Sequence, residues 1–207
     1  MALPASGSIS MNQVNVELGC GATSQRALND APVRTLFGKA SGQISMSDGY
    51  GKSNFPGGLG TYQSSQGGYY TGTQSGYYLW ATTATVGRQW KTTFTSTTNA
   101  ASTTDGYTNT MCNANATHPA FQYADGLSAG GFSDWYVGAR CELQQQYNNR
   151  SCGTIPSYGA SLYWSSTEFG AGPAWGLYFG DALPGGSWNC FIKTGTGCVR
   201  PLRRSLI

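Results

Sequence analysis

The sequence is poor in charge. Only 10% of its 207 residues are Asp, Glu, Lys or Arg, and no charged side chain occurs between Lys52 and Arg88. The net charge of +3 arises at the C-terminal end, from Arg200, Arg203 and Arg204, and not from a broad basic face. Proteins that bind nucleic acid usually present such a face, because they neutralise many phosphates. We therefore expect no nucleic-acid partner.

Long apolar runs are also missing. The opening stretch MALPASGSIS has neither the basic start nor the apolar segment of a signal peptide, and no window approaches the length of a membrane span. We expect no membrane insertion and no export by the usual secretory route.

The residues of common catalytic and metal sites are scarce. His118 is the only histidine, the nine carboxylates are scattered as single residues, and the six cysteines form no CxxC or His/Cys pair. Nucleophilic relays, paired-carboxylate hydrolysis and zinc binding need such groupings. We expect no enzymatic activity, no cofactor and no metal site.

The cysteines leave their own pairing open. In NCFIKTGTGC, Cys190 and Cys198 stand on either side of a Gly-rich turn. Facing strands could join them in a disulfide, or they could be two buried thiols. A bridge would indicate an oxidising medium, reached for example on release by cell lysis.

Glycine and aromatic residues are abundant, at 30 residues and 13% of the chain. These residues favour turns and strands over helices. The length suits one domain or one domain with an appendage. We predict an α+β protein with a loop-rich, mostly β body.

A near-duplicate phrase marks the N-terminal part: SGSISM at residues 6–11 returns as SGQISM at residues 41–46. Ser10 with Gln13, and Ser45 with Asp48, have the spacing of a capping box. Between them, Asn29 or Asp30 can cap a second helix that has Pro32 in its first turn and Gly38 at its end; Gly19 can end the first. The first 55 residues thus predict two or three short helices, too short to be stable alone.

This arrangement resembles a module of tailed-bacteriophage structural proteins, where phrases of the type SGxISxSD and SLNDxxVRTLxG, ending in YGKS, occur at the front of tail and fibre components. The matching residues are Ser6 to Leu18, Ala27 to Gly38 and Ser41 to Ser53. The resemblance implies a docking module for other phage structural proteins. A helical arm packed on its own domain is the alternative.

Strand signals dominate after the glycine-rich NFPGGLG. GGYYTGTQSGYYLWATT predicts a hairpin, while HPAFQYADGL and ARCELQQQYNN are the only helical candidates. SLYWSSTE, PAWGLYFGD, SWNCFIK and GCVRPLRR each predict a short strand.

Three phrases follow in order: GGFSDWYVGARCEL, YWSSTEFGAGPAWGLYF and VRPLR. Together they resemble the C-terminal domain of a Legionella collagen-like adhesin, which also occurs in phage and bacterial surface proteins. The resemblance implies a C-type-lectin-like fold with a small mixed antiparallel sheet, two helices and long ligand-binding loops. Val137 and Gly138 replace the usual Leu-Pro. The calcium-binding phrases EPN, QPD and WND of true C-type lectins are absent.

Several residues of these phrases suit the scaffold. Trp135 and Trp164 are large apolar anchors, and Asp134 can cap local backbone. Arg200 is a candidate partner for Asp134 or Glu142.

The segment GDALPGGSWNCFIK and the strand before it carry the candidate ligand contacts. Aromatic faces beside polar groups suit the CH surfaces and hydroxyls of sugars. The candidate ligand-binding residues are Trp175, Tyr178, Asp181, Trp188, Asn189 and Lys193.

The organisation expected from the sequence has three parts: a docking module at residues 1–55, a linker at 56–60 and a C-type-lectin-like domain at 61–207. We predict a phage tail-fibre or tip protein, on the virion and extracellular after lysis, that binds a host surface glycan or protein. A homo-oligomer, such as the trimer common among these proteins, is expected. The alternatives are a decoration protein of capsid or tail without ligand, a bacterial surface adhesin, and an oxidase-like enzyme using Cys190 and Cys198.

Overall fold

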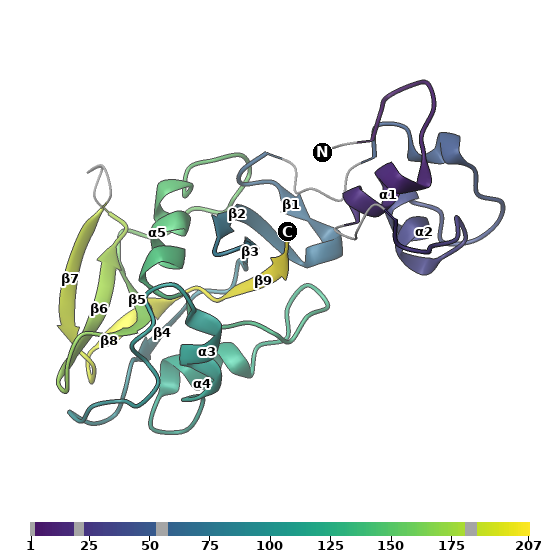
Figure 1. Cartoon of the computed structure of the whole chain (residues 1–207). Coiled ribbons are helices and arrows are strands. Elements are labelled where there is room, and N and C mark those ends of the chain that lie inside the picture. The colour runs from purple at the N-terminus through teal and green to yellow at the C-terminus, as the bar shows by residue number, and fades with distance from the viewer. Residues whose placement is uncertain (1–2, 19–22, 53–57, 181–185) are drawn as a thin grey trace. The chain divides into compact units, whose positions relative to one another are not determined.

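The computed structural model describes residues 3–18, 23–52, 58–180 and 186–207. It confirms the α+β class, because the chain contains both helices and strands. The chain divides into two compact units, Met1–Pro56 and Gly57–Ile207 (Figure 1).

The N-terminal unit is helical. Its described elements are α1 (Met11–Glu17), α2 (Ala31–Phe37) and the 3-10 helix η1 (Met46–Gly49). The repeated phrase starts the first and the last of them, as predicted. Ser10 and Gln13 exchange backbone-to-side-chain hydrogen bonds of 2.7 and 3.3 Å. Ser45 N–H donates to the Asp48 carboxylate at 2.8 Å. These bonds satisfy amides that a helix start leaves free.

Helix α2 also follows its sequence signals. Asp30 precedes the helix, Pro32 lies in the first turn, and Gly38 ends it in the left-handed conformation with a φ of 71°. Gly19, the expected end of the first helix, lies outside the described residues. The short helices share one core, formed by Val14 of α1 and Val33, Leu36 and Phe37 of α2 together with Leu3 and Ile9 from the segment before α1.

The larger unit has two sheets in its described part, where the sequence predicted a single one. The first has the order β1-β2-β3-β9 and is antiparallel. Its strands are β1 (Tyr62–Gln63), β2 (Gly68–Gln74), β3 (Tyr77–Ala81) and β9 (Leu202–Leu206), and the 3-10 helix η2 (Ser64–Gln66) follows β1. Strands β2 and β3 confirm the predicted hairpin. Its turn lies at Ser75 and Gly76, which both have positive φ, as a tight hairpin turn requires.

The second sheet has the order β4-β8-β5-β6-β7. Its strands are β4 (Val86–Gln89), β5 (Leu162–Glu168), β6 (Pro173–Tyr178), β7 (Ser187–Ile192) and β8 (Thr196–Val199). Neighbouring strands are antiparallel except β5 and β8, which are parallel. Strand β7 therefore forms one edge of this sheet.

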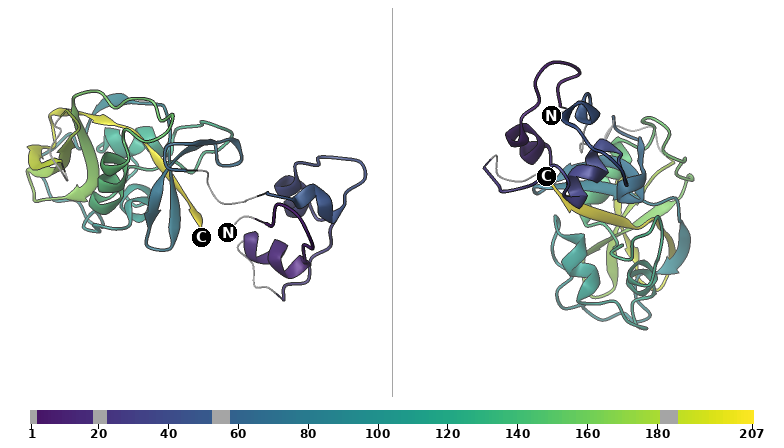
Figure 2. Two further views of the ribbon diagram at one scale, coloured as in Figure 1. Left: turned by 90° about the horizontal axis from the view of Figure 1, so that it is seen from above. Right: turned by 90° about the vertical axis from the view of Figure 1, so that its right-hand side faces the viewer.

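Three α-helices are described in the larger unit, one more than predicted. They are α3 (Gly106–Met111), α4 (Pro119–Asp125) and α5 (Arg140–Asn148). Helix α5 contacts β2 of the first sheet and β5 and β6 of the second (Figure 1, Figure 2). Successive residues of β5 point to opposite faces: Tyr163 joins the core beneath α5, and Trp164 joins the core beneath α4.

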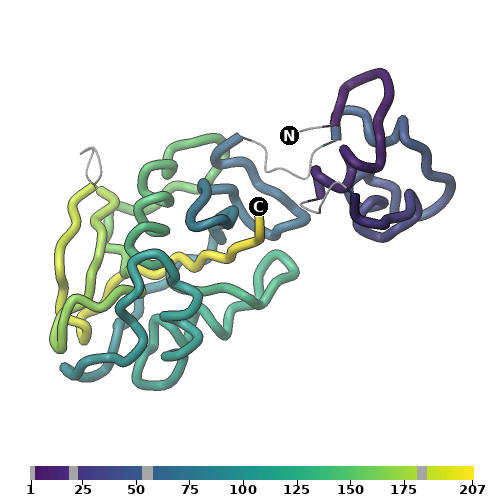
Figure 3. The backbone as a smooth tube through the Cα atoms, viewed as in Figure 1, coloured from purple at the N-terminus to yellow at the C-terminus, as the bar shows by residue number. Residues whose placement is uncertain are grey.

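The segment GCVRPLRR was predicted as one strand and forms two. Strand β8 belongs to the five-stranded sheet, and β9, after Arg200 and Pro201, belongs to the four-stranded sheet. The trace in Figure 3 shows this C-terminal segment running from one sheet to the other. Proline cannot donate to a strand ladder, so Pro201 suits the break between them.

The predicted scaffold residues are buried, but one predicted pairing is wrong. Trp135 and Trp164 are almost fully buried. Arg200 pairs with neither Asp134 nor Glu142; its guanidinium donates to the carbonyls of Pro156 and Ser157 and lies over the Tyr158 ring. Asp134 pairs instead with Arg203, at 2.8 Å. Arg203 lies in β9 next to Leu202, which pairs with Tyr136 close to Asp134, whereas Arg200 lies before β9 begins.

The Cys190–Cys198 bridge is not formed. Both thiols are free, and their strands β7 and β8 are separated by β5 and β6 in the sheet. Cys190 is exposed and Cys198 half-buried, so the pair is not a buried one either.

Candidate functional site

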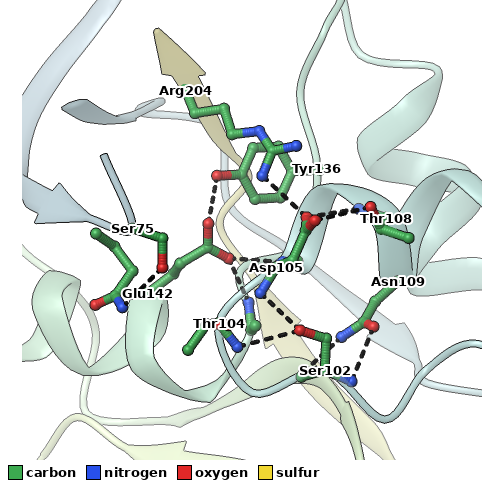
Figure 4. A network of polar contacts seen from close by, with 12 residues as sticks. Ser75, Ser102, Thr104, Asp105, Thr108, Asn109, Tyr136, Glu142 and Arg204 are labelled. Atoms are coloured by element: carbon green, nitrogen blue, oxygen red, sulfur yellow. Dashed lines mark hydrogen bonds and ion pairs between the residues drawn. The ribbon is translucent and has the colours of Figure 1, made fainter. Parts of the chain in front are cut away.

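Helix α5 is held at its start by a buried carboxylate. Glu142, in the first turn, accepts hydrogen bonds from the backbone N–H of Ala139 (2.8 Å), the backbone N–H of Gly106 (2.9 Å) and the hydroxyl of Tyr136 (2.7 Å) (Figure 4). A side chain at position 106 would meet the Glu142 carboxylate and the backbone of Val137 and Ala139 within 2.5 Å. The glycine is therefore needed for this close approach.

The environment of Glu142 opposes its ionisation. Burial raises the pKa of this carboxyl to about 7, although the three hydrogen bonds favour the charged form. The same surroundings, with the Glu142 charge nearby, raise the pKa of the Tyr136 hydroxyl well above its usual value.

A second carboxylate, Asp105, joins α3 to the C-terminal strand. It accepts from Thr108 N–H (2.9 Å) and from the Arg204 guanidinium (2.9 Å) (Figure 4). Partial burial opposes ionisation, but the Thr108 hydrogen bonds and the Arg204 charge hold the pKa of Asp105 below its usual value. The Arg204 guanidinium in turn lies over the rings of Tyr77 and Tyr107, at 4.5 and 4.8 Å. These contacts fix the start of α3 against β9, while the Gly106–Glu142 hydrogen bond joins it to α5.

A pocket of about 390 Å³ opens beside the helix that this network positions. We call it the α5 pocket. It is lined by Gln74, Thr103, Arg140, Cys141, Gln144, Gln145 and Trp188. The end of β2, the loop before α3, helix α5 and the edge strand β7 thus all contribute to one concave surface.

An arginine between two indole rings forms one wall of the α5 pocket. The guanidinium carbon of Arg140 lies 4.0 Å from the ring centre of Trp175 and 5.0 Å from that of Trp188. The two rings are nearly perpendicular, with centres 6.3 Å apart. Within the described ranges no carboxylate pairs with Arg140, and its buried Nε has no hydrogen-bond partner. Its charge is therefore stabilised here mainly by the aromatic faces.

Amide groups complete this wall. Gln144 lies one helical turn after Arg140 and accepts a hydrogen bond of 2.6 Å from the Trp188 indole N–H. Its amide nitrogen donates to Asn148 at 2.9 Å. The rotamers of Trp188 and Gln144 are thus set by contacts within the chain. The wall offers apolar rings, amides and a cation, with no nucleophile paired to a general base.

The predicted ligand residues fall into separate places. Trp175 and Trp188 come together beside Arg140, and Trp188 lines the α5 pocket. Tyr178 and Asn189 are exposed on the opposite face of the same two strands, by the alternation of strand residues. Asp181 lies outside the described residues.

The sequence predicted that Lys193 contacts the ligand, but the structure places it in the interior. It is fully buried, pairs with Glu168, and donates to the carbonyls of Thr95 (3.1 Å) and Ala171 (3.0 Å). A fully buried side chain cannot reach a ligand on the surface, so Lys193 is not proposed as a ligand contact.

A second buried lysine shares this polar cluster. Lys91 donates to the Thr95 and Ser96 carbonyls and to Thr97 Oγ1, which also contacts His118 Nε2 at 3.1 Å. Burial, with the charges of Lys91 and Lys193, lowers the pKa of His118 to about 4. The only histidine is therefore neutral near pH 7 and holds a loop in place.

Arg140, Gln144, Gln74 and Thr103 were not singled out from the sequence. The available signal was the spacing of Arg140 and Gln144, four residues apart on a predicted helix in a chain with few charges. The apolar residues Leu143 and Tyr147 of the same helix pack into the core.

No protein-family model matches the chain, and no curated protein matches it significantly. Among the described residues, no helix is long and apolar enough to cross a bilayer, and no group of three or more His, Cys, Asp or Glu side chains is arranged to hold a metal ion.

The buried position of Lys193 predicts a role in stability. Replacing one partner of a buried ion pair leaves the other uncompensated, so Lys193→Met is expected to cost about 3 kcal/mol of unfolding free energy. Denaturant unfolding measures this loss. Lys39→Met, which removes a more exposed ion pair with Asp48, is the control and should cost much less, because water screens exposed pairs. Unchanged stability in Lys193→Met would contradict the scaffold role.

The raised pKa of Glu142 predicts a pH effect on stability. The folded state favours the protonated carboxyl, so this stabilisation is complete below the ordinary pKa of 4.5 and is lost as the pH rises to about 7. Relative to wild type, the always neutral Glu142→Gln should therefore gain roughly 3 kcal/mol of unfolding free energy between pH 4 and 8. Denaturant unfolding across this range tests it, with the exposed Asp125→Asn as control. Parallel pH profiles of wild type and Glu142→Gln would refute the assignment.

Proposed function

We propose that this chain is a bacteriophage virion protein that binds a glycan on the host surface. In this proposal the α5 pocket is the glycan site, residues 61–207 form a C-type-lectin-like domain, and residues 1–55 dock on other structural proteins of the particle. The protein acts on the virion and outside the cell after lysis, as a homo-oligomer such as a trimer.

One observation carries the proposal. Trp188, Gln144 and Arg140 meet at a single concave surface, two of them held by a 2.6 Å hydrogen bond. Sugar rings present CH faces that stack on aromatic rings and hydroxyls that bond to amides and guanidinium groups. Because these side chains are already ordered, little conformational entropy is lost when a ligand binds.

The sequence phrases support the viral setting. The repeated capping phrase of the N-terminal unit resembles the front of phage tail and fibre components. The three ordered phrases of the larger unit resemble a domain found in phage and bacterial surface proteins. The helix starts encoded by the repeat form as expected, which supports a built module at the front of the chain.

A decoration protein without a ligand is the second candidate. It is favoured by the same contacts, because Trp188 and Arg140 already have partners within the chain: Gln144 for the indole N–H and two aromatic faces for the guanidinium. A purely structural wall would look similar.

Binding of the labelled full chain to candidate host cells, and to polysaccharides stripped from them, separates the two functions. Trp188→Ala and Gln144→Ala should each weaken binding by about tenfold or more, since each removes a contact to the sugar. Tyr178→Ala is the matched control, because this aromatic residue lies exposed on the opposite face of the same sheet. Absence of wild-type binding, or equal loss in all three variants, would favour the decoration protein.

A further inference from the structure

Three large apolar side chains are exposed together beside the turn between β5 and β6. The exposed fractions are 62% for Phe94, 53% for Phe169 and 60% for Ile192. Ile192 is the cross-strand neighbour of Pro173, and Phe94 lies beside Gly172. We call these three residues the apolar tip.

The backbone around the apolar tip is bonded to one buried ammonium group, that of Lys193. Lys193 Nζ bonds to the carbonyl of Thr95, next to Phe94, to the carbonyl of Ala171, at the turn, and to the carboxylate of Glu168, next to Phe169. A single fully buried cation thus ties together both loops that carry the exposed rings. Burying a charge is costly, and packing the core does not by itself require it. The arrangement fixes the backbone beside Phe94 and Phe169.

The apolar tip is continuous with the α5 pocket. The ring of Phe169 contacts Trp175 edge to face, with centres 4.8 Å apart, and Trp175 is 6.3 Å from Trp188 in the pocket wall. Arg140 lies over Trp175 and Trp188. One row of rings, Trp188, Trp175 and Phe169, therefore runs from the pocket to the apolar tip.

We propose that the ligand of the α5 pocket is a saccharide chain several sugars long, whose part outside the pocket lies along Phe169 and the apolar tip. This rests on the proposed glycan-binding function. A single terminal sugar needs only the pocket, and for it the ordered tip has no role. A longer chain stacks further rings on the aromatic row, and each stacked ring adds affinity.

The test compares ligand lengths with the full chain. Wild type is first screened against purified bacterial surface polysaccharides, and one that binds is then cut into fragments of graded length. Phe169→Ala should weaken binding of the intact polysaccharide by about tenfold and leave binding of the shortest fragment that the pocket holds unchanged. Gln144→Ala should weaken both, because it alters the pocket itself.

Two further variants make the result decisive. Ile192→Ser removes apolar surface from the other side of the apolar tip and should repeat the length-dependent loss if Phe169→Ala folds poorly. Tyr178→Ala should bind both ligands as wild type does. Equal losses on long and short ligands, or no loss on either, would overturn the extended-ligand proposal while leaving glycan binding intact. If wild type binds none of the polysaccharides, the proposed function fails and this inference fails with it.

Discussion

The buried carboxylate of Glu142 is the interaction on which the candidate site depends. It joins the turn before α5, the start of α3 and the hydroxyl of Tyr136, and Gly106 lets these groups approach closely. The helix fixed in this way presents Arg140 and Gln144 to the pocket and the neighbouring Leu143 and Tyr147 to the core. A shift of the helix start would move both sets together.

The chain has few charges and places several of them inside. Lys91, Lys193, Glu142, Arg200 and Arg203 are all buried. Their partners are largely backbone groups of loops, such as the carbonyls of residues 95, 96, 156, 157 and 171. Loops cannot satisfy their carbonyls by regular ladders, so buried cations supply the missing donors. Several of the few charged side chains thus serve to order the loops. The surface is rich in neutral polar groups instead.

Local signals were readable from the sequence, and long-range pairings were not. Capping spacings located the helix starts at Ser10 and Ser45, and the paired aromatic segments located the β2–β3 hairpin, because these features depend on neighbours in the chain. Strand order depends on distant partners, so the sequence did not reveal that two strands separate Cys190 from Cys198. Helix α3 was missed because GYTNTM has weak helix formers and is held by Asp105 and Glu142.

In the candidate site, too, long-range contacts could not be predicted from the sequence. Aromatic content drew attention to Trp175 and Trp188, whose strands are neighbours in the sheet. Arg140 and Gln144 come from a helix distant in sequence, and only packing brings them to the same wall. Lys193 looked like a surface residue because lysine is usually exposed, and its burial depends on the carboxylate of Glu168.

The most direct test of the glycan-site account is the NMR spectrum of the chain on addition of a host polysaccharide fragment. If the α5 pocket binds glycan, the indole N–H signal of Trp188 and the side-chain amide signals of Gln144 shift most, with smaller changes for residues on the Tyr178 face of the sheet. Shifts centred on that opposite face, or on the N-terminal unit, would contradict it.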